Sequence, residues 1–236
     1  MLNKFKQRSS ESELLDRPGI PKEMLLRNLH ELDFFNRVSG GYRISLNGIR
    51  KLVTDKNKIY HIVDLGCGSG ALLKVIAGWA SREGYKVKLT GVDRNADVID
   101  YLKEYCREYP AIQGVACDYR DFLKPGIPVD IIHCSLFCHH LSDDELIDLL
   151  SYCRQCARSG FVINDLHRHW LAYAGVIMIT RLFNGSVLSK NDGPVSVMRA
   201  FKKRELMALL QETEIFHYTL NWKWVFRYLI VGFHSD

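Results

Sequence analysis

Three kinds of feature are missing from this sequence, and each absence excludes a class of protein. The longest apolar run, residues 170–179, is well short of the ~20 residues that cross a bilayer. The first residues are polar and lack an apolar core, so we expect no secretory signal and a cytoplasmic location. The seven cysteines are therefore expected to be reduced thiols.

A concentrated positive charge is also missing. The net charge of +5 is spread over 236 residues, which is too diffuse to indicate nucleic acid by itself. No RNA-binding module is visible along the chain. We expect neither nucleic acid nor stable membrane insertion. The length and the 47% hydrophobic content suit one α/β domain with a short extension.

The most informative segment that is present is a glycine-rich turn. Residues 64–70 read Asp-Leu-Gly-Cys-Gly-Ser-Gly, and they lie between an apolar run and a helix-forming run that starts at Ala71. A buried strand, a glycine turn and a helix in this order form a nucleotide-binding βα unit. Glycine suits the turn because the backbone needs positive φ angles there and must let a ligand approach closely.

Polar residues follow the strands that we expect next. The second strand ends at Asp93, and the third is followed by Asp118 and Tyr119. The fourth ends at Ser135 and opens into a loop with two histidines. Because parallel strands end at one edge of a sheet, these residues should meet where α/β proteins bind ligands. A carboxylate at the tip of the second strand is placed to accept hydrogen bonds from a ribose.

Over roughly residues 58–236, these motifs resemble the class I S-adenosylmethionine-dependent methyltransferases. The resemblance implies a Rossmann-like three-layer αβα sandwich whose seven-stranded sheet is mostly parallel, with an antiparallel hairpin at residues 214–234. It implies an enzyme (EC 2.1.1) with S-adenosyl-L-methionine as cofactor. The cofactor-binding residues that it implies are Asp64, Gly66, Cys67, Gly68, Gly70, Asp93, Arg94, Asp118, Tyr119 and Ser135.

Two alternative functions stay open. A nicotinamide-dinucleotide-dependent oxidoreductase would carry Gly-x-Gly-x-x-Gly, whereas this turn has Gly-x-Gly-x-Gly followed by Ala71. A non-catalytic protein that only binds S-adenosylmethionine is the other alternative. The fourth strand continues into Ser-Leu-Phe-Cys, without the Pro-Pro-Tyr or Pro-Cys runs of enzymes that methylate nucleic-acid bases. We therefore expect a small-molecule acceptor.

We divide the chain into a helical extension at residues 1–55 and a methyltransferase domain at residues 56–236. Within the extension, the apolar spacing predicts an amphipathic helix over Lys22–Val38 and a further helix over residues 45–54. The extension either packs over the mouth of the cofactor site or covers the core. The polar residues that we single out in it are Arg8, Glu13, Asn36 and Tyr42.

Residues 166–200 form a long insert that we expect to cover the acceptor site. Its run 170–183 is apolar nearly all round, which predicts a helix that walls an apolar pocket or packs in a homodimer. We place four residues of the insert in acceptor binding: Arg168, Trp170, Tyr173 and Arg199. Arg168 binds an acidic acceptor or, alternatively, pairs with Asp165.

Several segments of the extension and the insert are similar to a bacterial methyltransferase group associated with type III polyketide synthase clusters. They are residues 14–16, 35–41, 164–169 and 191–201. This resemblance implies a small apolar, phenolic or polyketide-like acceptor, and we expect methylation at oxygen.

Histidines follow the fourth and fifth expected strands. A hydroxyl acceptor must lose a proton, and the pKa of histidine lies near neutrality, which suits a general base. His140 is our first candidate for this role, and His139 and His167 are the others. Each could instead have a purely structural role.

Four cysteines invite a different interpretation. Cys153 and Cys156 form a C-x-x-C pair, with Cys134 and Cys138 upstream, and such pairs can bind zinc. However, the first pair falls on a helix expected over residues 143–157, while Cys134 falls on a strand. Small buried thiols explain these positions as well, and we expect no metal.

Overall fold

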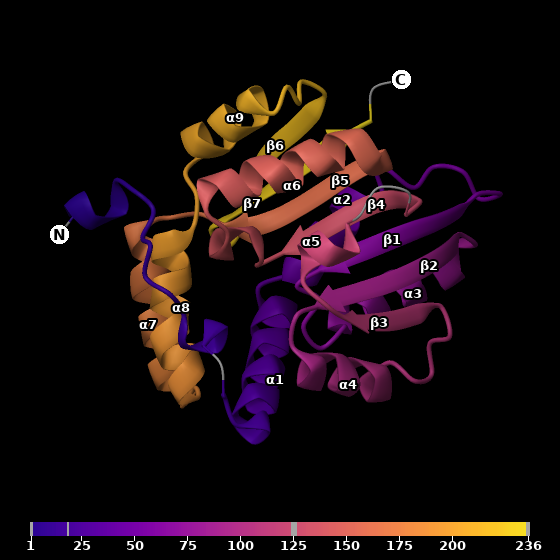
Figure 1. Ribbon diagram of the computed structural model, residues 1–236. Coiled ribbons are helices and arrows are strands. Elements are labelled where there is room, and N and C mark those ends of the chain that lie inside the picture. Colours follow the sequence, from indigo (N-terminus) through magenta and orange to yellow (C-terminus); the bar gives the residue numbers. More distant parts are fainter. Residues whose placement is uncertain (1, 18, 124–126, 235–236) are drawn as a thin grey trace.

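A single seven-stranded sheet organises the protein, seen here in a computed structural model that describes residues 2–17, 19–123 and 127–234. The strand order is β3-β2-β1-β4-β5-β7-β6 (Figure 1). The strands are β1 (Ile59–Leu65), β2 (Lys86–Asp93), β3 (Ile112–Ala116), β4 (Val129–Ser135), β5 (Ala157–Leu166), β6 (Tyr218–Lys223) and β7 (Arg227–Phe233). Strands β1 to β5 are parallel, and β7 runs antiparallel between β5 and β6. The predicted fold class is confirmed.

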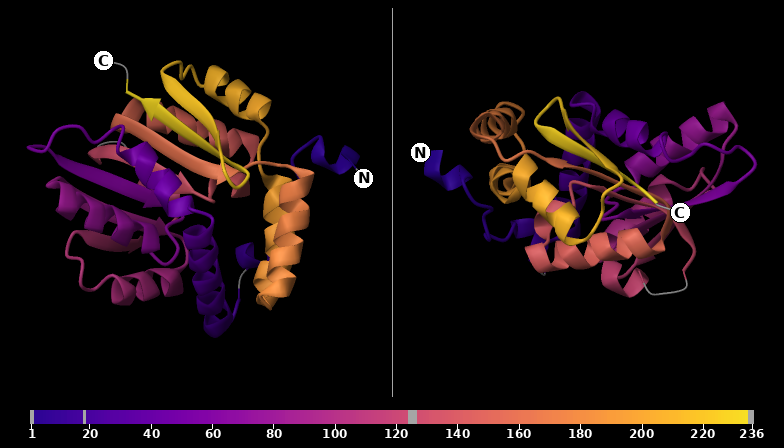
Figure 2. Two further views of the ribbon diagram at one scale, coloured as in Figure 1. Left: turned by 180° about the vertical axis from the view of Figure 1, so that it is seen from behind. Right: turned by 90° about the horizontal axis from the view of Figure 1, so that it is seen from above.

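Helices cover both faces of the sheet, because its central strands are apolar on both sides. One face packs against α2 (Gly41–Ile49), α3 (Ala71–Glu83) and α4 (Ala96–Tyr105). The other packs against α5 (Tyr119–Phe122), α6 (Asp143–Cys156) and α9 (Lys203–Glu212). Each face therefore has its own hydrophobic core, and the view from above in Figure 2 shows the two helix groups on opposite sides of the sheet.

A third group of helices stands beyond the carboxyl ends of the parallel strands. It consists of α1 (Lys22–Val38), α7 (Trp170–Leu182) and α8 (Val187–Arg199), with the short 3-10 helices η1 (Leu2–Phe5), η2 (Leu14–Asp16) and η3 (Cys138–His140). Figure 1 shows α1 and the α7–α8 pair side by side below the sheet. Hydrogen bonds join them, because Glu31 accepts from Ser186 at 2.8 Å and Asn28 donates to Ser189 at 3.1 Å. In the part of the chain that the structure describes, no helix is long and apolar enough to cross a membrane.

The predicted helices and strands agree with the observed ones where the regular spacing of apolar residues extends over a long stretch of chain. Helix α1 occupies the predicted residues, and strand β4 ends at the predicted Ser135. Helix α2 begins at Gly41, earlier than the predicted 45–54, because Gly40 supplies the left-handed turn before it. Helix α8 was not predicted, since it contains Pro194, which lacks an N–H group and usually ends a helix.

Helix α7 does not wall a buried pocket. Only Thr180 of its residues is buried, and the helix packs mainly against α8. Its large apolar side chains are exposed, including Met178 at 63% and Leu182 at 75%. Helix α8 lies nearer the strand ends, because Asp192 accepts the backbone N–H groups of Leu14 and Leu15 in η2.

A buried polar network ties α2 to the centre of the sheet. Asp64 on β1 lies 2.6 Å from Nδ1 of His133 on β4, and Nε2 of His133 lies 2.9 Å from the Ser45 hydroxyl on α2. Asn164 on β5 donates to the same hydroxyl at 2.9 Å and to the Gly41 carbonyl at 3.0 Å. All four side chains are buried, so the network sets the register of α2 over three strands.

Arg168 is a structural residue, which corrects both of its predicted roles. Its guanidinium pairs with Glu205 on α9 and not with Asp165. Its other N–H groups donate to the backbone carbonyls of Phe5, Lys6 and Ala200. All five N–H groups are thereby used within the protein, and the side chain is 1% exposed, so none remains for an acidic acceptor.

We expect the substitution Arg168→Met to lower the free energy of unfolding by about 3 kcal/mol, because it leaves Glu205 and three carbonyls without their donor. Chemical denaturation followed by circular dichroism measures this. Arg158→Met, at an exposed position in β5, is the matched control and should change stability by less than about 0.5 kcal/mol. Equal stability of the two variants would contradict the structural role.

Candidate functional site

The glycine turn has the backbone conformation that its sequence predicts. Gly66, Gly68 and Gly70 have φ angles of 65°, 51° and 76°, which side-chain-bearing residues rarely adopt. A Cβ on Gly66 would lie 2.4 Å from the Phe137 ring, whereas a Cβ on Gly68 would meet only Leu29 of α1, at 3.5 Å. The backbone of Gly66 therefore lies directly against the Phe137 ring, and the backbone of Gly68 lies beneath Leu29 of α1.

Other residues of this motif point into the protein. Asp64 belongs to the buried network with His133, and its side chain faces the interior. The Cys67 thiol is buried against Gly91, and burial raises its pKa well above the ordinary value. Both residues shape the turn through the backbone.

Asp93 stands at the tip of β2, beside the turn. Its Oδ1 accepts the Asn95 N–H at 3.0 Å, and no side chain in the described ranges donates to it. Burial raises the pKa of this carboxyl, although the N–H groups of Asn95 and Gly68 oppose the shift. The carboxylate thus has acceptor capacity that a ligand hydroxyl would use. The neighbouring Arg94 instead pairs with Asp16 at 2.9 Å.

Tyr119 and Phe137 form the wall next to Asp93. Their rings meet edge to face with centroids 5.5 Å apart. The Tyr119 hydroxyl is buried and has no hydrogen-bond partner among the described residues, and burial raises its pKa to about 12. Asp118 caps α5 and pairs with Arg120. Leu136 has a φ of 51°, so the backbone is strained where β4, just after Ser135, turns Phe137 over Gly66.

The amino-terminal extension is joined to the turn by hydrogen bonds. Asp33 on α1 accepts from the Ser69 hydroxyl at 2.8 Å, and it also accepts from the Tyr42 hydroxyl at 2.6 Å. Together with Leu29 over Gly68, these contacts place α1 directly against the motif. The sequence did not identify Asp33, because nothing in a helical pattern marks one acidic residue as a partner of a distant turn.

A second group of polar residues lies at the tips of β4 and β5. His139 and His140 form adjacent rings with centroids 4.3 Å apart. Asp165 lies 2.7 Å from Nδ1 of His139, and Asp16 lies 3.2 Å from Nδ1 of His140. Glu13 faces both rings from the extension, 3.5 Å from Nε2 of His139 and 3.8 Å from Nε2 of His140. We call Glu13, His139 and His140 the histidine cluster.

Charge pairing sets the protonation of this cluster. Burial disfavours the imidazolium of His139, but the carboxylates of Asp165 and Glu13 outweigh burial and raise its pKa to about 10. In turn, His139 holds the pKa values of Asp165 and Glu13 below their usual range despite burial. His139 is therefore an imidazolium near neutral pH, and it is an unsuitable proton acceptor.

Arg199 and Arg8 hold the histidine loop through its backbone. Arg199 donates to the carbonyls of His139 at 3.0 Å and His140 at 2.6 Å, and to that of Glu11 at 2.7 Å. Arg8 donates to the carbonyl of Leu141 at 2.7 Å. The structure thus places Arg199, predicted to bind the acceptor, where it positions the histidines and the extension.

Asp16 connects the two halves of the site, because it contacts both Arg94, which follows Asp93, and His140. The turn and the histidine cluster are therefore neighbours at one edge of the sheet. Sequence reasoning singled out Glu13 only as a polar residue of the extension and gave Asp16 no role. No local motif marks two carboxylates that meet histidines more than 120 positions away.

His167, the third predicted base, lies in a different group. Its ring packs against His169 and Tyr228, with centroids 5.4 and 4.9 Å away, and the Trp222 indole donates to its Nδ1 at 3.3 Å. Burial lowers the pKa of His167 to about 4. Trp170 stacks on His169 and is 49% exposed. The structure therefore does not bring His167 together with His139 and His140.

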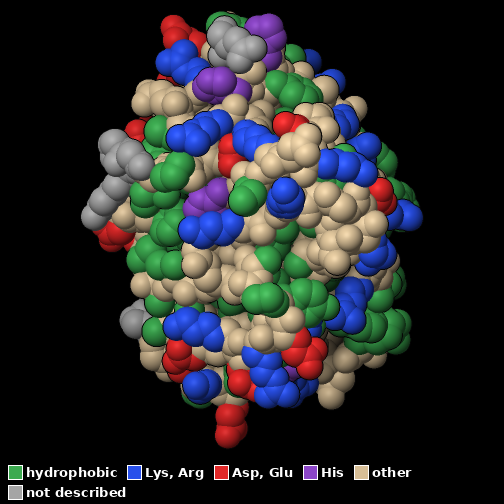
Figure 3. All heavy atoms as spheres, turned by 90° about the vertical axis from the view of Figure 1, so that its right-hand side faces the viewer, with side chains coloured by type: hydrophobic (Ala, Val, Ile, Leu, Met, Phe, Trp, Pro, Cys, Tyr) green, Lys and Arg blue, Asp and Glu red, His purple; other side chains and the backbone are tan. Residues whose placement is uncertain are grey.

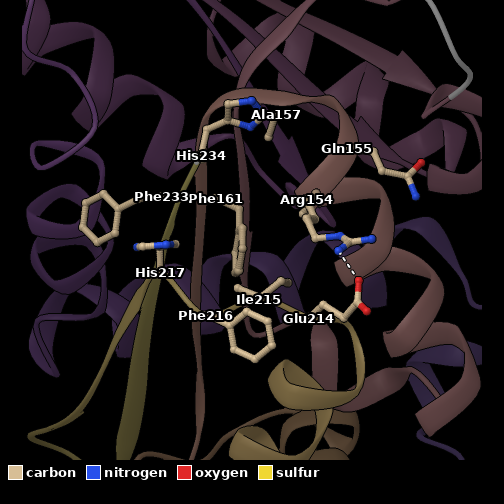
Figure 4. A pocket seen from close by; sticks show the side chains of 12 residues that line it. Arg154, Gln155, Ala157, Phe161, Glu214, Ile215, Phe216, His217, Phe233 and His234 are labelled. Carbon is tan, nitrogen blue, oxygen red and sulfur yellow. Dashed lines mark hydrogen bonds and ion pairs between the residues drawn. The ribbon is translucent and has the colours of Figure 1, made fainter. Parts of the chain in front are cut away.

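Two surface hollows among the described residues differ in whether predicted site residues line them. A groove of about 460 Å³ between α7 and α8 includes Tyr173 in its lining. A pocket of about 380 Å³ lies at the opposite end of the sheet, where Arg154 and Glu214 pair across it at 2.6 Å (Figure 4). That pocket contains none of the predicted site residues.

The surface and the cysteines add two observations. On the face that Figure 3 shows, Lys and Arg side chains are interspersed with acidic and apolar ones.

Cys134, Cys138 and Cys153 lie in the hydrophobic core. Among the described residues, the only group with metal-ligand spacing is the histidine cluster, and no cysteine belongs to it.

Comparison with known proteins gives the same assignment as the geometry. Residues 62–160 match the family described as methyltransferase domain. This match covers the glycine turn, most of strand β1 and the strands β2, β3 and β4. Among curated proteins, the chain is 27% identical over 138 residues to ubiquinone biosynthesis O-methyltransferase of Coxiella burnetii, which covers 57% of this chain. It matches only 55% of the length of that relative.

Solved methyltransferase structures share the fold. Human N-acetylserotonin methyltransferase in complex with S-adenosylmethionine superposes with a TM-score of 0.63 at 16% identity, over 92% of this chain and 57% of that one. The plantazolicin methyltransferase in complex with S-adenosylhomocysteine gives a TM-score of 0.63 at 16% identity, over 91% of this chain and 97% of that one.

The described residues fit S-adenosylmethionine, the cofactor of the methyltransferases that the chain resembles. The Asp93 carboxylate has acceptor capacity at the place where a ribose would lie. The buried Tyr119 hydroxyl lacks a partner within the described ranges, and the bare backbone of Gly68 is partly exposed. S-adenosylmethionine supplies hydroxyl groups, a polar purine and a charged amino-acid end that would use these features.

The neutral state of His167 makes protein stability depend on pH. Because its pKa is about 4 in the folded protein and about 6.5 in an unfolded chain, only the unfolded chain gains this proton between those values. Stability is therefore fully present above pH 6.5 and falls as the pH drops toward 4. We expect His167→Gln to lose less stability than wild type over this range, as measured by urea unfolding at several pH values. Parallel pH profiles would contradict the assignment.

Proposed function

We propose that this protein transfers a methyl group from S-adenosylmethionine to an oxygen of a small acceptor. The observation that carries the proposal is that Asp16 joins two half-sites. It contacts Arg94, which follows Asp93, and it contacts His140 in the histidine cluster. A cofactor bound at the glycine turn and an acceptor bound at the cluster would then be neighbours. Holding reactants in this way can supply about 7–11 kcal/mol of the barrier.

The chain's own residues bind and orient the cofactor. Asp93 would accept hydrogen bonds from the ribose, Tyr119 and Phe137 would flank the base, and the backbone of Gly66 and Gly68 would receive the amino-acid end. When bound, S-adenosylmethionine supplies a methyl group on a sulfonium, which needs no further activation. Asp33 and Leu29 of α1 cover this region and limit the access of water.

His140 is the residue through which we propose that the acceptor oxygen is activated. His139 already holds a proton between two carboxylates, and His167 lies in the other group of rings. His140 is one-fifth exposed and sits between Asp16 and Glu13, which would stabilise a positive charge developing there. Arg199 holds its carbonyl and thus its orientation.

A small apolar or phenolic acceptor is favoured on two grounds. The segments similar to the polyketide-associated group lie around this site: η2 carries Asp16, and residues 191–201 include Asp192, which binds η2, and Arg199. The curated relative is named for O-methylation in ubiquinone biosynthesis. The alternatives of a dinucleotide oxidoreductase and a cofactor-binding protein without activity are separated by the next two experiments.

We expect Asp93→Asn to weaken binding of S-adenosylhomocysteine at least about tenfold, because a charged hydrogen-bond acceptor is lost. Isothermal titration calorimetry measures the affinity. Asp97→Asn, an exposed carboxylate of α4 that pairs with Lys22, is the control and should bind as wild type does. Binding of NAD in place of S-adenosylhomocysteine by the wild-type protein would overturn the proposal.

We expect His140→Ala to retain S-adenosylhomocysteine binding and to lose about 100-fold or more in turnover. Turnover is followed as methyl transfer to a panel of phenolic acceptors. His217→Ala, at an exposed position beside the opposite pocket, should retain the wild-type rate. An unchanged rate in His140→Ala would remove this residue from the mechanism. A wild-type protein that binds the cofactor but methylates no acceptor of the panel would favour the non-catalytic alternative.

A further inference from the structure

The histidine cluster has the composition and spacing of a metal-binding site. One ligand atom from each of Glu13, His139 and His140 lies within 4.8 Å of the others. Nε2 of each imidazole faces the same carboxylate, at 3.5 Å from Oε1 and 3.8 Å from Oε2. Ligands bound about 2.0–2.1 Å from a tetrahedral ion lie about 3.3 Å apart. Small side-chain movements would therefore bring all three atoms onto one ion.

The groups around the cluster orient the imidazoles for this purpose. Metal-bound histidines commonly donate the other ring N–H to a carboxylate, which fixes the tautomer and the ring direction. Both histidines here meet that condition, because Nδ1 of His139 contacts Asp165 at 2.7 Å and Nδ1 of His140 contacts Asp16 at 3.2 Å. The loop itself is fixed by Asp165, which also accepts the His139 backbone N–H at 3.2 Å.

Burial and charge also favour a cation. Glu13 and His139 are 3% and 2% exposed, whereas the His140 side chain is 20% exposed. The carboxylates of Glu13, Asp16 and Asp165 face the two imidazoles. The guanidinium groups around them are those of Arg94, which pairs with Asp16, and of Arg8 and Arg199, which donate to the backbone of the histidine loop. A divalent ion bound in place of the His139 proton would keep a positive charge beside the buried carboxylates of Glu13 and Asp165.

We propose that Glu13, His139 and His140 bind one divalent first-row transition-metal ion, with Zn²⁺ as the probe of choice. Two imidazoles and one carboxylate suit zinc and its neighbours, whereas magnesium and calcium prefer sites made wholly of oxygen. Binding releases any proton held on the coordinating nitrogens to solvent. Three protein ligands leave a coordination position open.

The open position gives the site a use that rests on the proposed function. It lies at the strand tips beside the cofactor half-site, where an acceptor oxygen would arrive. A bound cation would polarise that oxygen and lower the pKa of its hydroxyl. In the metal-bound state, His140 acts as a ligand, and the ion removes the need for a free imidazole base.

The experiment measures metal binding directly. The full chain is stripped with a chelator and titrated with Zn²⁺ in competition with a chromophoric chelator. We expect one ion per chain. Glu13→Gln and His139→Asn should each weaken binding at least about 100-fold, and Asp165→Asn about tenfold. His167→Asn removes an imidazole from the other histidine pair and is the matched control, so it should bind as wild type does.

Cobalt distinguishes this site from the seven cysteines. Co²⁺ bound by nitrogen and oxygen gives weak visible bands without a thiolate charge-transfer band, and we expect this spectrum. A strong thiolate band, no stoichiometric binding, or binding that survives both Glu13→Gln and His139→Asn would overturn the proposal. If His139→Asn does not fold by circular dichroism, His140→Asn replaces it, because that side chain is partly exposed.

Binding of S-adenosylhomocysteine to the same stripped samples separates the two proposals. If the stripped protein binds this ligand but no metal, the metal site is wrong and the proposed function stands. If it binds metal in the cluster but no S-adenosylhomocysteine, the metal site stands and the proposed function is wrong.

Discussion

The hydrogen bond between Asp64 and His133 is the interaction on which the arrangement of the site depends. It joins the two central strands at 2.6 Å in the interior of the protein, and the other nitrogen of His133 reaches Ser45 of α2. Because buried polar groups must be satisfied, α2 has one position over the sheet. The glycine turn begins directly after Asp64, so this network also sets where the turn starts.

From that fixed point, the extension completes the site. Helix α1 ends just before α2, and Asp33 and Leu29 reach the glycine turn from it. Farther toward the amino terminus, Glu13 and Asp16 approach the histidine loop, held in place by Asp192 and Arg199. Residues before the first strand thus contribute to both the cofactor half and the acceptor half. The insert serves mainly to hold them there.

Much of the fold followed from residue patterns. The apolar period over Lys22–Val38 is long and regular, and that helix occurs as predicted. Strand β4 also ends at the predicted Ser135, because a short apolar run there meets a polar turn. Helix α8 escaped prediction because Pro194 normally breaks a helix, and α7 is apolar without being buried. Composition alone cannot tell a buried apolar face from an exposed one.

The sequence by itself determined the βα unit, the glycine turn and the carboxylate at the tip of the second strand, because each depends on residues close together in the chain. Only the tertiary structure decided which side chains face a ligand. It directed Arg168 to Glu205 and Asp64 to His133, and it brought Glu13 to His139 across 126 positions (139 minus 13). Such pairings arise from the packing of the extension on the sheet edge, and no periodicity in the chain encodes them.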